Sequence, residues 1–233
     1  MKNQYSFIDF SRANDCSSPS ILMRHDVDLS VHNAYEMAKI ENDLGICSTY
    51  FFLLRNWFYD LREFEIYSLA KHIHNLGHEI ALHFDFEYFP GQAITSYEHF
   101  LKSLERQKNE LQDILDLEIK TYSMHMPTSI DAGLFSLIKK HDTHLGMINT
   151  YADSITKKFK YCSDSNGVWR FDKLDDLIDP EEFQYLHILL HPEWWTKRLL
   201  TPRQKVERAL QGRAKAMLRN FDELMIKFDR PYF

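Results

Sequence analysis

Short apolar runs, rich in β-branched and aromatic residues, recur along this chain between stretches whose apolar residues have helical spacing. Such runs predict buried strands, and the stretches between them predict helices that cover the strands. Strands are expected at 21–28, 46–54, 78–84, 119–124, 145–151, 168–171 and 185–190. Helices are expected at 31–44, 61–76, 96–116, 131–140 and 202–228, after an irregular arm at 1–20.

The alternation of strand and helix predicts parallel strands joined by helical crossovers. No linker rich in Gly, Ser or Pro and no repeat interrupts it, so we expect one domain over residues 1–233. Two architectures fit, a β/α barrel and an open doubly wound sheet. The polar residues at the carboxyl ends of several strands favour the barrel, because those ends then converge on one mouth.

The apolar run at 21–28 ends in two carboxylates, Asp26 and Asp28. Side chains alternate along a strand, so both acids point to the same face. Two acids so close repel each other, and a metal ion or a shared proton is the simplest reason to keep them together. The alternative is a solvated strand end or a helix cap.

A second group of polar residues follows the strand expected at 78–84. His83 shares a strand face with Asp85, and Glu87 comes two residues later. With Asp28 these residues offer nitrogen and oxygen ligands that suit zinc, iron, manganese or nickel. The alternative is a core histidine bonded to a backbone carbonyl.

Five short motifs lie in order between residue 21 and about residue 195. They are Arg24-His25-Asp26-Val27-Asp28, Ser48-Thr49-Tyr50-Phe51-Phe52, Gly77-His78-Glu79-Ile80-Ala81-Leu82-His83, Ser123-Met124-His125-Met126-Pro127 and Leu189-Leu190-His191-Pro192. In this order they resemble the motifs of the polysaccharide deacetylase superfamily, the NodB-like carbohydrate esterases. The first motif is similar to the Arg-x-Asp-Val-Asp of a branch linked to bacterial surface polysaccharides.

The resemblance implies an α/β fold of the (β/α)7 type, a distorted or incomplete TIM-like barrel. It also implies metal-dependent removal of an N-acyl or O-acyl group from a sugar. By the same resemblance Asp26 is the catalytic base, Asp28 and His83 are metal ligands, and His191 is the general acid. The metal is expected to be zinc, with iron, cobalt, nickel or manganese as alternatives.

The third metal ligand stays open between two acids. In the family a second histidine lies four residues after the first, and that position here is Glu87. Strand geometry favours Asp85, because residues two apart on a strand share a face without a special turn. The family's third motif contains an arginine, and His125-Met126-Pro127 has none at the central place. We place His125 with the substrate-binding residues, and metal ligation or orientation of Asp26 are its other candidate roles.

Aromatic and basic residues near these motifs suggest a substrate site. Trp194 and Trp195 follow His191 in a predicted loop at the mouth, where sugar rings stack on aromatic planes, or else the two tryptophans cover the edge of the core. Arg170 lies in a long irregular region. It is a candidate for binding an anionic group such as a nucleotide or lipid-linked phosphate, and a surface ion pair is the alternative.

Composition narrows the class of protein. The net charge of −6, without a basic cluster, argues against a nucleic-acid binder. No apolar run is long enough to span a bilayer, and residues 1–7 lack the apolar core of a signal peptide, so we expect a cytoplasmic protein. Cys16, Cys47 and Cys162 have no paired spacing, which argues against disulfides or a zinc knuckle. The oligomeric state is not indicated, and the apolar side of 202–228 favours packing on the barrel over packing on a second subunit.

These observations predict a metal-dependent hydrolase that removes an acyl group from a sugar or glycan precursor. A nucleotide-linked or lipid-linked sugar in surface-polysaccharide assembly, such as O-antigen or capsule, fits the expected location. The alternative is a catalytically inactive barrel that binds a glycan or a partner enzyme, because two of the family's motifs are altered. A third possibility is that the same site hydrolyses another kind of bond.

Overall fold

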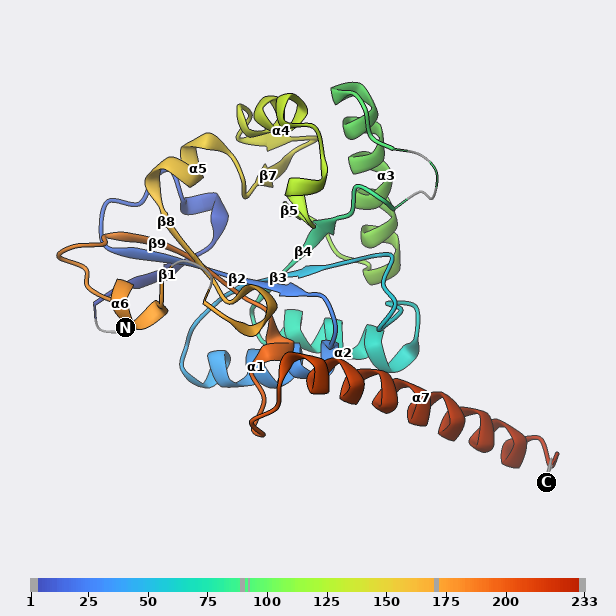
Figure 1. Cartoon of the computed structure of the whole chain (residues 1–233). Coiled ribbons are helices and arrows are strands. Elements are labelled where there is room, and N and C mark those ends of the chain that lie inside the picture. The colour runs from blue at the N-terminus through green and yellow to red at the C-terminus, as the bar shows by residue number, and fades with distance from the viewer. Residues whose placement is uncertain (1–3, 89–90, 92, 170–171, 231–233) are drawn as a thin grey trace.

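The computed structural model describes residues 4–88, 91, 93–169 and 172–230. Its central strand, β2 (Ser20–Val27), is buried along its whole length. It has parallel neighbours on both edges, β3 (Thr49–Phe52) and β9 (Tyr185–Leu190), in one curled sheet (Figure 1). A strand in this position is covered on both faces, which explains the continuous apolar run at its start.

The remaining strands extend the sheet on either side of β2. The order is β6-β7-β5-β4-β3-β2-β9-β8, and β1 pairs with the first residues of β2. Among the described pairs, β6 with β7 is antiparallel and the others are parallel. The bounds are β1 (Ser6–Ile8), β4 (Glu79–Phe84), β5 (Thr121–Met124), β6 (Thr143–His144), β7 (Met147–Asn149) and β8 (Lys160–Ser163).

Helices connect the strands and cover the outer side of the curl (Figure 1). The bounds are α1 (Val31–Asp43), α2 (Phe64–Asn75), α3 (Tyr97–Leu115), α4 (Ala132–Lys139), α5 (Asp153–Lys158), α6 (Leu174–Leu177) and α7 (Pro202–Lys227). α1 begins after the expected N-cap Ser30, whose side chain accepts a hydrogen bond from the backbone of Asn33. α2 is followed by Gly77, which has a φ of 92° that favours glycine.

The pleat of the strands separates two cores. Tyr50 and Phe52 point outward into the core shared with α1, α2 and α3. Phe51 points to the inner side of the curl, together with Leu22. Asp26 lies opposite Phe51 in the register between β2 and β3, so Asp26 also faces the inner side. The register of the sheet therefore directs the acid of β2 into the mouth of the half-barrel.

The architecture confirms the predicted fold class. A curled half-barrel sheet surrounded by helices is a distorted barrel of the (β/α)7 type. Six of the expected strands correspond to β2, β3, β4, β5, β7 and β9. The strand expected at 168–171 is wrong over its described residues, 168–169, and β8 at Lys160–Ser163 pairs with β9 instead. The pattern missed β8 because its first two residues are exposed.

Both ends of the chain differ from expectation. The described part of the arm contains β1 and a 3-10 turn, η1 (Phe10–Arg12), and its residues Tyr5, Ile8 and Phe10 are buried. The apolar side of α7 was expected to pack on the barrel, but none of the α7 residues is buried. Among the helices of the described ranges, none combines the length and apolar character that crossing a bilayer requires.

Candidate active site

Five polar side chains from four strands meet at the carboxyl end of the sheet. They are Asp26 in β2, Asp28 just after β2, His83 in β4, His125 just after β5 and His191 just after β9. Nε2 of His83 lies 3.4 Å from Oδ2 of Asp26 and 3.5 Å from Oδ1 of Asp28. Nε2 of His191 lies 3.8 Å from Oδ2 of Asp28. The parallel register brings residues far apart in sequence into one cluster.

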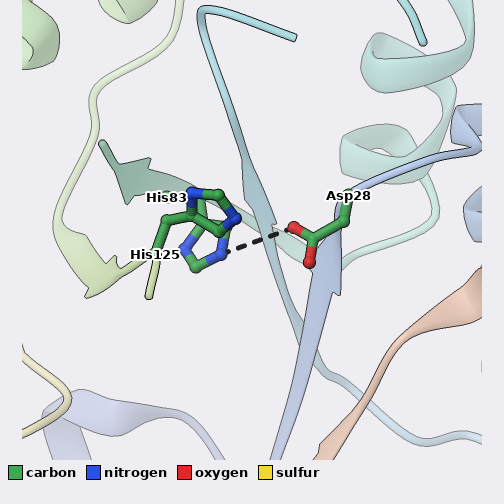
Figure 2. A group of neighbouring side chains, drawn as sticks. All are labelled: Asp28, His83 and His125. Atoms are coloured by element: carbon green, nitrogen blue, oxygen red, sulfur yellow. Dashed lines mark ion pairs between the residues drawn. The ribbon is translucent and has the colours of Figure 1, made fainter. Parts of the chain in front are cut away.

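Asp28, His83 and His125 form the part of this cluster that can hold a metal. One ligand atom of each residue lies within 4.8 Å of the ligand atoms of the other two. Figure 2 shows the two imidazoles side by side and facing the carboxylate, and their ring centroids are 5.2 Å apart. Two histidines and one carboxylate are typical ligands of zinc and of other divalent transition metals.

The state of these donors fits a divalent cation. Oδ1 of Asp28 is buried without a hydrogen-bond partner among the described residues, and burial raises the pKa of this carboxyl group. Nδ1 of His83 shares a 2.7 Å hydrogen bond with Oγ of Ser123, which leaves Nε2 directed at the carboxylates. Burial lowers the pKa of His83 to about 3, so its imidazole is neutral, as a ligand must be.

Asp26 is held by an arginine of its own strand. Arg24 is fully buried and donates from Nε and Nη2 to the two carboxylate oxygens, each at 2.7 Å. Its guanidinium lies over the rings of Phe51 and Tyr151, 5.3 Å and 5.1 Å from their centroids. Burial alone would raise the pKa of Asp26, but Arg24 and His83 hold that pKa well below its usual value. The carboxylate is therefore ionised and fixed in orientation.

His191 is held in the opposite charge state by a buried acid. Its Nδ1 donates to Oδ1 of Asp164 at 2.7 Å, and its backbone N–H donates to the same carboxylate. The indole N–H of Trp195 donates to Oδ2 of Asp164, also at 2.7 Å. Burial disfavours a charged imidazole, but Asp164 and Asp28 outweigh it and raise the pKa of His191 to about 9. Nε2 of His191 therefore carries a proton at neutral pH and faces the metal-binding group.

The two acids after β4 lie outside the three-residue group. Oδ2 of Asp85 accepts from Nε of Arg55 at 3.2 Å, and Oδ1 accepts from the backbone N–H of Glu87 at 2.9 Å. The side chain of Glu87 is exposed, with an oxygen 3.8 Å from Nη2 of Arg55. β4 ends at Phe84, so the strand alternation that favoured Asp85 as a ligand does not extend to it. His125 occupies the third place in the group.

The aromatic loop after β9 has two parts with different surroundings. Trp195 is 49% exposed at the site and is anchored through Asp164. Trp194 is less exposed, its backbone oxygen accepts from Lys205, and its Nε1 is buried without a partner among the described residues. Glu193, directly before Trp194 in the chain, also has both carboxylate oxygens buried without a hydrogen-bond partner among the described residues, and burial raises its pKa well above the usual value. Arg170, a candidate for binding an anionic group, lies outside the described residues.

Asp164 and Arg24 belong to the site but were not predicted as site residues from the sequence. Asp164 follows β8 directly, just as Asp28 follows β2, but β8 was not recognised as a strand. Arg24 was visible only as part of a motif. Its position two residues before Asp26 on a strand places both on one face, so the pairing was available from alternation alone.

Comparisons with known proteins bear on the fold. The sequence matches no protein-family model and no curated protein. The structure resembles the chitin deacetylase of the fungal pathogen Colletotrichum lindemuthianum, with a TM-score of 0.52 and 12% identity over 84% of this chain and 83% of that chain.

A second solved structure shares the same architecture. It is a mutant, with restored enzymatic activity, of a family 4 carbohydrate esterase pseudoenzyme of Bacillus anthracis. The TM-score is 0.50 at 12% identity, over 86% of this chain and 64% of that chain. At such low identity the likeness is one of fold, and the chain shares its fold with family 4 carbohydrate esterases.

Proposed function

We propose that this chain is a metal-dependent hydrolase that removes an acyl group, N-acetyl or similar, from a sugar or sugar-containing precursor. One observation carries the proposal. An ionised acid, Asp26, lies 3.4 Å from His83, and a protonated base, His191, lies 3.8 Å from Asp28, so both adjoin the Asp28–His83–His125 group. Such a pair in opposite charge states is what acid–base catalysis of acyl transfer requires.

The three-residue group would hold the metal, and the neighbouring acid would accept a proton. A divalent ion bound by Asp28, His83 and His125 would polarise the acyl carbonyl and lower the pKa of a water molecule. Asp26 lies next to this group and accepts the proton of the attacking water. Its two bonds to Arg24 keep it ionised and fix its orientation beside His83. Asp26 therefore accepts a proton, and Asp28 binds the metal ion.

His191 supplies the proton for the leaving group. Expulsion of an amine or an alkoxide is slow unless its nitrogen or oxygen is protonated as the bond breaks. With a pKa raised to about 9, His191 enters the reaction charged. Asp164 holds the ring by Nδ1, so Nε2 is the atom that donates. After donation the neutral ring remains oriented by the same bond.

The substrate class rests on the aromatic rim and on the fold. Trp195 offers a half-exposed ring beside the proposed acid, a surface on which a sugar ring stacks. The solved structures of similar fold bear the names of a chitin deacetylase and of a family 4 carbohydrate esterase pseudoenzyme whose mutant has restored activity. We extend the proposal to a nucleotide-linked or lipid-linked sugar of surface-polysaccharide assembly, acted on in the cytoplasm. Trp194 and Arg170 remain candidates for binding such a precursor.

A second function is favoured by one specific observation. Glu87, four residues after His83, is exposed and does not reach the site, so the family's paired-histidine arrangement is absent at that position. A barrel that binds a glycan or a partner enzyme without hydrolysis would tolerate this change. A pseudoenzyme of similar fold makes the alternative concrete.

Acetate release distinguishes the two functions. The chain, loaded in turn with zinc, cobalt, nickel, manganese and iron(II), would be incubated with N-acetylated and O-acetylated sugars, free and nucleotide-linked. Hydrolysis predicts acetate release above that of the chelator-treated protein with at least one metal. Stoichiometric metal binding without release from any member of the panel would favour the binding barrel.

A further inference from the structure

A pocket of about 680 Å³ lies between the loop that follows β9 and the start of α7, and no step of the proposed reaction uses it. Two indole rings, two basic side chains and the first polar residues of the helix line this pocket. They are Trp194, Trp195, Arg198, Thr201, Gln204 and Lys205. None of the described residues that line it is acidic.

Trp195 connects this pocket to the candidate active site. Its indole N–H donates to Oδ2 of Asp164 at 2.7 Å, and Oδ1 of the same carboxylate accepts from Nδ1 of His191, also at 2.7 Å. One carboxylate group therefore joins the wall of the pocket to the proposed proton donor. The pocket adjoins the site on the side of the leaving group, where the sugar of the substrate would lie.

The chain around the pocket is basic, although the protein as a whole has a net charge of −6. No acid occurs between Glu193 and Glu207. The basic residues of this stretch are Lys197, Arg198, Arg203 and Lys205. Arg203 pairs with Glu207 at 2.8 Å, and Asp164, which Trp195 contacts, is paired with His191. The remaining cations give the pocket a positive potential.

Arg198 and Lys205 bring their charges to the pocket from two different elements. Arg198 lies in the loop and is exposed. Lys205 lies near the start of α7, and its ammonium group donates to the backbone oxygen of Trp194. An ammonium group has three N–H donors, so this bond leaves two for a ligand. The positive end of the dipole of α7, capped by Thr201, adds to the two cations.

The aromatic wall of the pocket is held in place by neighbouring segments. A Cβ atom at Gly167 would lie 3.4 Å from the ring of Trp194 and 3.4 Å from the side chain of Pro202, so the loop after β8 packs directly on both. The ring of Trp195 packs edge to face on that of Trp169, with centroids 6.2 Å apart. Both indoles are therefore fixed in position beside the two cations.

We propose that this pocket binds a phosphate group attached to the sugar of the substrate. Phosphate oxygens accept charge-assisted hydrogen bonds from guanidinium and ammonium groups, and the indole of Trp195 offers a face for the sugar ring. The inference rests on the proposed function for the sugar and adds the group by which the protein selects it. Nucleoside-diphosphate sugars and lipid-diphosphate sugars share this chemistry, whereas a neutral polysaccharide offers Arg198 and Lys205 no charged partner.

Sugars without an acyl group test the phosphate site apart from hydrolysis. Glucose 1-phosphate and glucose are titrated into the full chain in a calorimeter, since neither has an acyl group to lose. Glucose 1-phosphate is expected to bind at least about 10-fold more tightly, the contribution of one charge-assisted hydrogen bond. Equal affinity for the two sugars would overturn the proposal. Glucuronic acid binding as tightly as glucose 1-phosphate would also overturn it, because its anion is a carboxylate.

Variants of the two cations test whether the phosphate binds in this pocket. Arg198→Gln and Lys205→Gln are each expected to weaken binding of glucose 1-phosphate by about 5-fold or more, with an unchanged melting temperature. The matched control is Arg219→Gln, because the side chain of Arg219 is 62% exposed on the same helix and lies outside the described lining. Unchanged affinity in either pocket variant, or an equal loss in Arg219→Gln, would overturn the proposal.

Two further titrations distinguish the sources of the phosphate. UDP-glucose and farnesyl-diphosphate-linked glucose are each expected to bind at least as tightly as glucose 1-phosphate, and the tighter of the two identifies the carrier. The proposal can fail separately from the proposed function. Acetate release from acetylated sugars with no preference for a phosphate would keep the hydrolase and contradict the phosphate site. Phosphate binding without acetate release from any sugar would keep the phosphate site and contradict the hydrolase.

Discussion

Arg24 and Asp26, two residues apart on one buried strand, form a two-point ion pair with both bonds at 2.7 Å. This ion pair keeps the carboxyl group of Asp26 ionised and fixes the orientation of its side chain. It also separates the two acids of the first motif, because Asp28 has no such partner and its Oδ1 stays available. The two neighbouring acids thereby take different roles: Asp26 accepts a proton, and Asp28 binds the metal ion.

Arg24→Met is expected to destabilise the fold by about 3–5 kcal/mol, because it leaves the carboxylate of Asp26 buried without a counter-charge. Chemical denaturation at pH 7 measures the loss. Arg24→Lys is the control, since it keeps the charge and loses the two-point geometry. We expect Arg24→Lys to fold and to be less active than the wild type. The acid limb of its pH–activity profile is expected to move to higher pH, because the pKa of Asp26 is then lowered less. An Arg24→Met protein as stable as the wild type would contradict this role.

The ligand set predicts which substitutions abolish metal binding. Asp28→Ala, His83→Ala and His125→Ala are each expected to weaken metal affinity by more than about 100-fold, because each removes one of three ligands. Calorimetric titration with zinc measures the affinity. Asp85→Asn is the matched control, since Asp85 is engaged by Arg55, and is expected to change the affinity less than about 10-fold. Loss of metal in Asp85→Asn with retention in His125→Ala would restore Asp85 as the third ligand.

Asp164 predicts a specific change in the pH profile. The pKa of His191 is raised to about 9, so the proton donor is present below that pH and activity falls as pH rises through it. Asp164→Asn removes the charge that raises this pKa, and the alkaline limb of kcat/KM is expected to move down by about one unit or more. Trp195→Phe removes one bond to Asp164 and should move the limb less. An unchanged limb in Asp164→Asn would exclude His191 as the acid seen in the profile.

The buried position of His187 predicts that the fold loses stability as the pH falls. It is buried on β9, and burial, then Arg24, lowers its pKa to about 3. In the unfolded chain the histidine binds a proton near pH 6.5, so between pH 6.5 and about 3 the unfolded state holds more protons. Stability therefore falls with falling pH in this window, by about 1.4 kcal/mol per unit for one histidine. His187→Leu is expected to reduce the slope between pH 6 and pH 4.5 by about that amount in urea titrations, and an unchanged slope would contradict it.

The sequence pattern predicts the residues at the ends of the strands, but it does not predict the conformation of the loops that follow them. Asp26, Asp28 and His83 are on or next to strands with strong apolar patterns, so alternation places them correctly on the inner side. Asp85 lies beyond the last residue of β4, where the backbone turns and an arginine from another loop captures the carboxylate. No pattern in one sequence encodes that capture. His125 remained open among three roles for the same reason.

The other differences from the prediction, at β8 and at α7, depend on contacts between residues that are far apart in the sequence. β8 has exposed residues at its start, so its apolar pattern is too short to recognise, and Asp164 at its end stayed in an irregular region. The apolar stripe of α7 was read correctly, but a stripe does not say whether the barrel or another chain covers it. The side of α7 that contacts the body is fixed by Arg213 and Lys205, which are polar.

The division of labour between Asp26 and Asp28 is tested most directly by one comparison. Metal content and acyl release are measured on the same preparation of Asp26→Asn and of the wild type, with the acylated sugar on which the wild type is active. We predict that Asp26→Asn binds one divalent ion as tightly as the wild type and loses at least about 100-fold in kcat/KM, the contribution of a general base. Full activity in Asp26→Asn, or loss of its metal, would contradict the account.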